Sequence, residues 1–248
     1  LIYSNMNIYS VPDLYDAIHK DSSFDIQLLK AIAKNRSGSV LELASGTGRL
    51  TKCILDLGLD YTGLELSKQF IEVAKKRYVG QARFVLGDMC DFKLNMKYNF
   101  IFIGFNSFLH NLTLIDARNC LRCVYDHLED KGKFLVSIFI PDPDFLFREP
   151  NTFYPATSFF QYKDSQCRIM ESNEYDDKTQ INKLTWYLEK NGEIMSDEYH
   201  YSMRMYYPHE MDILLVESGF HIEEKIGDYD GSPMDAESGM QIYICSKD

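Results

Sequence analysis

The sequence of 248 residues has no apolar run near the ~18 residues that a membrane-spanning helix needs. Its first residues also lack the basic stretch followed by an apolar one that marks a secretory signal. We therefore expect a cytoplasmic protein with no membrane partner. Because the chain begins at Leu1 rather than Met, we allow for a natural N-terminus that is missing from this sequence.

Basic residues are too few for a protein that binds the phosphate backbone of nucleic acid. The chain has 26 Lys plus Arg against 37 Asp plus Glu, a formal net charge of -11. A negative surface repels nucleic acid, so we expect no nucleic-acid partner and favour a small molecule.

The cysteines do not follow the spacing of a disulfide scaffold or of a metal-binding motif. The six thiols are scattered, which fits neither a disulfide scaffold nor paired metal knuckles. Cys120 and Cys123 form one C-x-x-C, but they fall within an amphipathic helix pattern that starts at Thr113. We interpret both as packing thiols, with a redox or metal role as the alternative, and we expect no metal site.

Short apolar runs alternate with helical patterns between residues 39 and 140. The expected strands are 40–43, 61–64, 83–86, 100–103 and 133–140, and two more close the chain at 220–226 and 240–245. Alternation of this kind predicts an α/β fold with a doubly wound, mostly parallel, seven-stranded Rossmann-like sheet. Ligands of such sheets bind beyond the carboxyl ends of the strands.

The alternation of short apolar runs and helical patterns stops between residues 150 and 207, where long runs rich in Tyr, Thr and Ile take its place. Asn191-Gly192, between runs 181–190 and 193–207, is a strong hairpin signal. We expect an antiparallel β insert of three strands, acting as a lid, before the last helix. At the other end of the chain, apolar residues at helical spacing follow Ser22 and Asp25, a plausible capping pair.

A glycine-containing turn follows the first expected strand. Gly46 and Gly48 allow a tight turn and close approach of a ligand to a helix N-terminus. The third glycine of a dinucleotide fingerprint is absent, since Thr51 stands there. Glu42, inside the strand, would repel a pyrophosphate but suits a ligand that carries an ammonium group.

The turn resembles motif I of the class I S-adenosylmethionine (SAM)-dependent methyltransferases, E/D-x-G-x-G-x-G, with Ala44 replacing the first glycine. The resemblance implies SAM as cofactor and acidic residues after the second and third strands for its ribose and adenine. The cofactor-binding residues that it implies in these strands and loops are Glu42, Ala44, Gly46, Thr47, Gly48, Glu65, Leu66, Asp88, Met89 and Phe105.

Residues 104–112 resemble the F-S-S-x-G-H-L segment of the bacterial amino-sugar N,N-dimethyltransferases. This resemblance implies His110 as the general base, because imidazole titrates in the required range, and Asn106 as a substrate contact. A histidine that caps the next helix or binds a backbone carbonyl is the alternative. Leu109 and Asn106 depart from the family pattern, so the substrate can differ.

Two residues outside this sheet also resemble family positions. Tyr15, with Asp16, resembles a pair that folds over the methionyl end of SAM, and an aromatic anchor for the leading helix is equally plausible. Arg204 resembles an arginine near the substrate, and a surface charge is an equally good interpretation.

The resemblance also implies a domain division. Residues 39–149 and 208–248 would form the SAM-binding methyltransferase domain, 1–38 an N-terminal helical segment over the cofactor site, and 150–207 the insert. We expect in-line transfer of a methyl group to nitrogen or oxygen of a small molecule. An NAD(P)-dependent oxidoreductase and a non-catalytic SAM-binding protein are the alternatives, and we also allow for a homodimer.

Overall fold

The computed structural model describes residues 5–34 and 36–247, and the chain divides into two compact units. One comprises Ser23–Ile140 and Tyr206–Asp248, and we call it the core unit. The other comprises the residues up to Ser22 together with Pro141–Met205, and we call it the insert unit. Among the described residues, no helix has the length and apolar character needed to cross a membrane.

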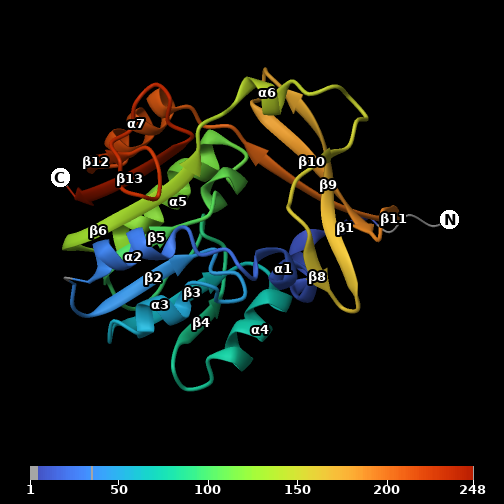
Figure 1. Ribbon diagram of the computed structural model, residues 1–248. Helices are drawn as coiled ribbons and strands as arrows, with labels where there is room; N and C mark the ends of the chain where they lie inside the picture. Colours follow the sequence, from blue (N-terminus) through green and yellow to red (C-terminus); the bar gives the residue numbers. More distant parts are fainter. Residues whose placement is uncertain (1–4, 35, 248) are drawn as a thin grey trace. The chain divides into compact units, whose positions relative to one another are not determined.

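The core unit is built on a seven-stranded sheet with the order β12-β13-β6-β5-β2-β3-β4 (Figure 1). Neighbours from β6 to β4 run parallel, whereas β13 is antiparallel to both β6 and β12. The α/β class and the mostly parallel pairing are therefore confirmed. The strands are β2 (Ser39–Leu43), β3 (Asp60–Glu65), β4 (Arg83–Leu86), β5 (Tyr98–Ile103), β6 (Leu128–Phe139), β12 (Phe220–Ile226) and β13 (Met240–Lys247).

Helices connect these strands, and their ends follow the local sequence. The Ser67 hydroxyl accepts from the Phe70 N–H, and the Thr113 hydroxyl accepts from the Asp116 N–H, so both are N-caps. Pro208 begins the last helix, and Gly219 follows it with a φ of +86°. The helices are α2 (Ile26–Ala33), α3 (Thr51–Leu55), α4 (Lys68–Arg77), η2 (Ser107–His110), α5 (Leu114–His127) and α7 (Pro208–Glu217).

Both faces of the parallel sheet are buried. Phe100 and Phe102 of β5 pack in a cluster with side chains of α2 and α3, whereas Ile101 and Ile103 face the opposite side, since side chains alternate along a strand. All four are essentially inaccessible to solvent. Burial on both sides accounts for the largely apolar sequences of the central strands β2 and β5. The Cys120 and Cys123 thiols are free and buried in α5, as packing thiols should be.

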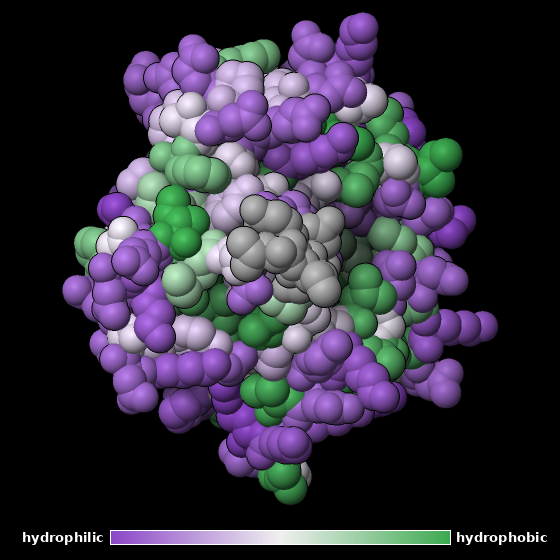
Figure 2. All heavy atoms as spheres, turned by 90° about the vertical axis from the view of Figure 1, so that its right-hand side faces the viewer, coloured by the Kyte–Doolittle hydropathy of each residue, from purple (hydrophilic) through white to green (hydrophobic). Residues whose placement is uncertain are grey.

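The insert unit holds a second, six-stranded sheet with the order β1-β11-β10-β9-β7, in which β8 also pairs with β9. Its apolar cluster includes Ile8, Leu14, Ile169 and Leu188. Hydrophilic side chains cover most of the face shown in Figure 2, and apolar ones form small separate groups there. The elements are β1 (Asn5–Asn7), η1 (Ile8–Ser10), α1 (Pro12–His19), α6 (Pro143–Leu146), β7 (Tyr154–Pro155), β8 (Phe160–Tyr162), β9 (Ser165–Asp176), β10 (Ile181–Lys190) and β11 (Glu193–Arg204).

The division of the chain differs from the predicted one at three places. The predicted helical segment 1–38 is split, because β1 pairs in parallel with β11 and joins the insert unit, whereas α2 belongs to the core unit. The insert begins at Pro141 and ends at Met205, not at 150 and 207. Its predicted three strands are joined by the short strands β7 and β8, which are too brief to leave a periodic pattern.

The β10–β11 turn offers a test of the insert's hairpin. Asn191 and Gly192 both have positive φ, +51° and +87°, so a side chain at 192 strains the backbone. We expect Gly192→Ala to lower the free energy of unfolding by about 1 kcal/mol in urea titrations. Gly239→Ala, where an added Cβ meets nothing within 4 Å and φ is not positive, should be neutral. Equal effects of the two changes would contradict the turn geometry.

Candidate functional site

The strand order places four chain reversals at one edge of the core sheet. Strands β5, β2, β3 and β4 are parallel neighbours, so their carboxyl ends lie together. The chain runs outward from β2 through β3 to β4 and then returns to the other side of β2 as β5. The gap between β2 and β5 is therefore a topological switch point, where open α/β sheets bind ligands.

The turn after β2 has the conformation that its glycines permit. Ala44, Gly46 and Gly48 all have positive φ, at 56°, 59° and 85°. A Cβ at Gly48 would lie 2.9 Å from the Tyr78 ring, so packing excludes a side chain there. A Cβ at Gly46 would meet only Phe70, at 3.9 Å, so the space above this backbone is open to a ligand.

Glu65, the last residue of β3, holds this turn in place. Its Oε2 accepts from the Gly46 N–H at 2.9 Å, and its Oε1 accepts from the Ser67 N–H at 2.7 Å. Burial raises the pKa of Glu65, and the backbone N–H groups oppose that rise. Each carboxylate oxygen has a second lone pair, so the group can also accept from the two hydroxyls of a ribose.

Exposed apolar side chains flank these polar strand ends. Leu66, directly after Glu65, is 68% exposed, and Leu86 at the end of β4 is 52% exposed. Asp88 follows on the same loop, is exposed, and accepts the Cys90 N–H at 2.8 Å. Apolar surface beside an exposed carboxylate suits an adenine ring with its exocyclic amine, so the predicted residues fit the nucleoside of SAM.

Glu42 lies beneath the turn and not on its surface. Its side chain is 5% exposed and accepts the hydroxyl of Tyr61 from the neighbouring strand. Burial raises the pKa of Glu42 to about 8, although the Tyr61 hydrogen bond and the Arg49 charge oppose the rise. The group is therefore mainly a neutral acid at pH 7, and its predicted contact with an ammonium group stays a prediction.

An ion pair that sequence patterns missed fixes the next residue of the turn. The Arg49 guanidinium donates to both carboxylate oxygens of Asp25, at 2.8 and 2.5 Å, and lies 4.8 Å from the Phe105 ring centroid. The predicted capping role of Asp25 is wrong, because its side chain makes no cap hydrogen bond. The ion pair ties α2 to the turn after β2. Sequence patterns do not pair these two residues, because 24 positions separate them along the chain.

The loop after β5 is strained and anchored. Phe105 and Asn106 have positive φ, 53° and 63°, which costs non-glycine residues about 1 kcal/mol each. The Asn106 side-chain oxygen accepts the Phe139 N–H at 2.8 Å, and so it is bound to β6. Contact of Asn106 with a substrate stays a prediction, for which its amide nitrogen can donate and its oxygen keeps a second lone pair.

His110 ends the 3-10 turn η2 and is half-buried, beside the fully buried Leu109. The next residue, Asn111, is 1% exposed and accepts the Cys90 thiol at 2.9 Å and the Tyr206 hydroxyl at 2.5 Å, the latter through its backbone carbonyl. The segment that carries His110 is thus fixed from two other loops. Sequence patterns missed Asn111 and Tyr206, because neither residue belongs to a motif.

Tyr15 and Arg204 belong to the insert unit. The centroid of the Tyr15 ring lies 4.4 Å from that of His19 and 6.0 Å from that of Tyr9, within an aromatic cluster. Arg204 is 6% exposed and donates to the Gln180 side chain at 2.5 Å, so the interpretation as a surface charge is wrong. Their roles toward SAM and substrate stay predictions.

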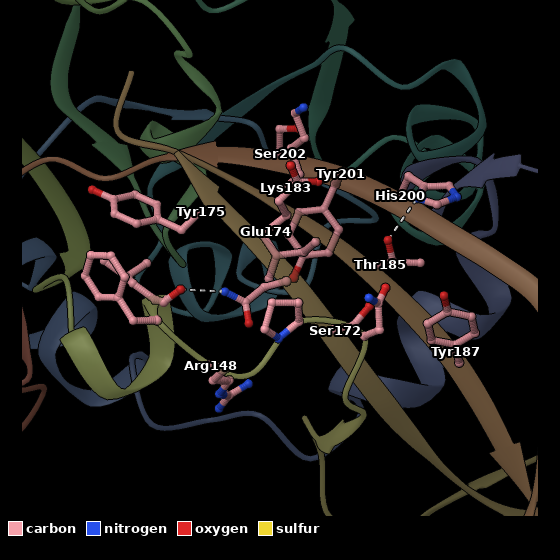
Figure 3. A pocket seen from close by; sticks show the side chains of 16 residues that line it. Arg148, Ser172, Glu174, Tyr175, Lys183, Thr185, Tyr187, His200, Tyr201 and Ser202 are labelled. Atoms are coloured by element: carbon pink, nitrogen blue, oxygen red, sulfur yellow. Dashed lines mark hydrogen bonds between the residues drawn. The ribbon is translucent and has the colours of Figure 1, made fainter. Parts of the chain in front are cut away.

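The insert unit contains a cavity of about 790 Å³ within the size range of small-molecule sites (Figure 3). Two cross-strand rows on one sheet face contribute to it, since partners in register share a face. The Thr185 hydroxyl and His200 Nδ1 are 3.1 Å apart in one row. The rows are Ser172, Thr185 and His200, and Glu174, Lys183 and Ser202. The described residues contain no group of three metal-ligating side chains.

Comparison with known proteins agrees with this site. Residues 40–132, which contain the turn after β2 and the three following loops, match the family model described as "Methyltransferase domain". The matched segment is less than half of the chain, and over this segment the chain is similar to a methyltransferase domain. Residues 40–132 lie in the core unit of the structure, so the matched segment includes Glu42, Glu65, Asp88 and His110.

Curated relatives are similar to this chain over part of their length. The dTDP-3-amino-3,4,6-trideoxy-alpha-D-glucopyranose N,N-dimethyltransferase of Streptomyces venezuelae is 30% identical over 132 residues, which are 50% of this chain and 55% of that protein. The uncharacterized methyltransferase OB1106 of Oceanobacillus iheyensis is 31% identical over 107 residues, 43% of this chain and 49% of that one. The chain spans about half the length of the curated relatives it matches.

Solved structures share the fold over nearly the whole chain. The CcbJ methyltransferase from Streptomyces caelestis is 23% identical with a TM-score of 0.82 and covers 97% of this chain and 98% of its own. DesVI from Streptomyces venezuelae is 19% identical with a TM-score of 0.71 and covers 95% of this chain and 98% of its own. The fold outside residues 40–132 is therefore also shared.

The buried carboxyl of Glu42 predicts a pH dependence of stability. The folded state binds this proton more tightly than the unfolded state, so the stabilisation is complete below the ordinary glutamate pKa and is lost as pH rises through about 8. Glu42→Gln keeps an acceptor for Tyr61 but cannot ionise. Between about pH 5 and about pH 8, we expect the free energy of unfolding of the wild type, measured in urea, to fall relative to that of Glu42→Gln by on the order of 1 kcal/mol or more.

The control for this measurement is Glu72→Gln, an exposed position on α4. It should leave the pH profile of unfolding parallel to that of the wild type. Parallel profiles for Glu42→Gln as well would show that Glu42 is ionised in the folded protein.

Proposed function

We propose that the protein moves a methyl group from SAM to a nitrogen or oxygen atom of a small molecule, with nitrogen favoured. The observation that carries the proposal is the arrangement at the carboxyl edge of the core sheet: Glu65 tied to the Gly46 backbone, with exposed Leu66 and Asp88 on the adjoining loops. The rival interpretation as a dinucleotide enzyme is disfavoured, because Thr51 stands where the dinucleotide fingerprint has its third glycine.

SAM, when bound, supplies an activated methyl group on a sulfonium leaving group. In this proposal the open backbone at Gly46 and the helix end beyond it receive the methionyl part. Glu65 accepts from the ribose hydroxyls, and Asp88 accepts from the adenine amine, with Leu66 and Met89 packing on the ring. Phe105, held by Arg49 and by stacking on Phe24 at 5.8 Å, shields the reacting side from water.

His110 is the proposed general base. An amine acceptor that arrives protonated must lose a proton to attack in line, and an imidazole near the reacting atoms can accept it at neutral pH. The anchored turn η2 fixes the backbone that carries the His110 imidazole. Much of the rate enhancement would therefore come from positioning of this ring. No other residue of the core unit combines a titrating side chain with a place on the loop after β5.

Support for nitrogen comes from similarity and from charge. The Streptomyces venezuelae relative is named as an N,N-dimethyltransferase of a dTDP-amino sugar. Solved structures with the same fold are titled as N-methyltransferases of a sugar or a glycopeptide. The net charge of -11 attracts cationic amines and repels nucleic acid.

The cofactor assignment is tested by calorimetry with S-adenosylhomocysteine. We expect Asp88→Ala to weaken binding by about tenfold or more, because a hydrogen bond from the adenine amine to a carboxylate is lost. Asp60→Ala removes an exposed carboxylate from the opposite end of β3 and should leave affinity unchanged. Equal affinities of wild type and Asp88→Ala, or tight binding of NAD(P) instead, would refute the cofactor map.

The transfer itself is tested with a panel of amines, amino sugars and phenols and with mass detection of methylated products. We expect His110→Gln to lower kcat by about 100-fold with little change in the affinity for S-adenosylhomocysteine, since the base acts only on the acceptor's proton. His209→Gln, an exposed histidine on α7, is the control. Binding of the cofactor analogue without turnover of any acceptor would favour a non-catalytic SAM-binding protein.

A further inference from the structure

Asn111 is the point at which three parts of the core unit meet beside His110. Its side-chain oxygen accepts the Cys90 thiol at 2.9 Å, and its side-chain nitrogen donates to the Phe108 carbonyl at 3.0 Å. Its backbone carbonyl accepts the Tyr206 hydroxyl at 2.5 Å. Since the residue is buried, each of these bonds is shielded from water and its loss is costly.

Tyr206 is held as firmly as the residue that it contacts. Its side chain is fully buried, and its ring lies 5.3 Å from that of Phe108, within η2. Its backbone carbonyl accepts from the Gln241 side chain at 2.7 Å, and Gln241 itself is inaccessible to solvent. Tyr206 is also the first residue of the core unit after the insert, so the returning chain is fixed at the segment that carries His110.

Cys90 connects the same anchor to the proposed adenine loop. Its N–H donates to Asp88, while its thiol donates to Asn111. Burial raises the pKa of the Cys90 thiol to about 12, so the group stays protonated and remains a donor. Asp88 and His110 are therefore linked through two residues, without any direct contact being required.

From this network we infer that Tyr206 and Asn111 are positioning residues for His110, and that Cys90 couples the position of His110 to occupancy of the Asp88 loop. Tyr206 orients the backbone directly after the base, and the strained residues Phe105 and Asn106 fix the backbone before it. A base held at both ends loses less orientational freedom when it acts. The inference rests on the proposed function for its effect on rate, but its structural part can be measured without an acceptor.

Tyr206→Phe is the decisive variant, because it removes only the hydroxyl and keeps the ring on Phe108. We expect kcat to fall about tenfold while the affinity for S-adenosylhomocysteine stays within about twofold. We also expect the ring resonances of His110, assigned with His110→Gln, to move in NMR spectra of the whole chain. The matched control is Tyr243→Phe, which loses another buried tyrosine hydroxyl, one that lies 3.1 Å from the Pro208 carbonyl and 3.3 Å from the Gln241 side-chain oxygen. This variant leaves in place the Gln241 side-chain nitrogen, which donates to Tyr206.

Tyr243→Phe should lower stability to a similar extent but leave kcat and the His110 resonances as in the wild type. If Tyr206→Phe behaves like Tyr243→Phe in both readouts, the positioning role is refuted. If the wild type methylates no acceptor, the proposed function fails, yet the resonances still decide whether Tyr206 fixes His110.

The coupling through Cys90 has its own pair of variants. Cys90→Ala removes the donor to Asn111, so binding of S-adenosylhomocysteine should weaken and should no longer move the His110 resonances. Cys90→Ser retains a hydroxyl donor and should restore both. Unchanged ligand-induced shifts in Cys90→Ala would overturn the coupling while leaving the role of Tyr206 intact.

Discussion

The two backbone hydrogen bonds accepted by Glu65 are the constraint on which the rest of the core unit depends. They join the turn after β2 to the start of α4 through a single carboxylate at the end of β3. A turn with three residues at positive φ is not stable by itself, so it needs an external acceptor for its N–H groups. The same carboxylate then has lone pairs left for a ribose. In the proposed function, folding and cofactor recognition therefore use one side chain, Glu65.

Charges in the core unit are arranged so that the buried ones are neutral or paired. Glu42 is protonated beneath the turn, and Asp25 forms a bidentate pair with Arg49. Arg49 in turn lies over Phe105, so the pair also stiffens the loop after β5. An ionised, unpaired carboxylate at either place would lower the free energy of unfolding, because its charge would be buried away from water. Asp88, the acid proposed to bind the adenine amine, is exposed instead.

The sequence predicted those features that local chemistry determines. β4, β10 and β12 have the expected ends, because apolar periodicity and turn residues such as Asn191-Gly192 mark them clearly. The residues of the turn after β2 were also found, since glycine and acid spacing there has a specific meaning. The pairing of β1 with β11 was missed, because three residues carry no period and their partner is almost two hundred residues away.

The missed site residues share one physical property: they act through contacts that the fold creates. Asp25 looked like a helix cap and became the partner of Arg49. Tyr206 looked like one of many tyrosines before the last helix, yet its hydroxyl holds the carbonyl after His110. A motif records the groups that touch a ligand, whereas the groups that hold them are chosen by geometry across the chain. For this protein, the positioning of the proposed base His110 therefore depends on the tertiary fold, through Asn111 and its three partners. It does not depend on the segment around His110 alone.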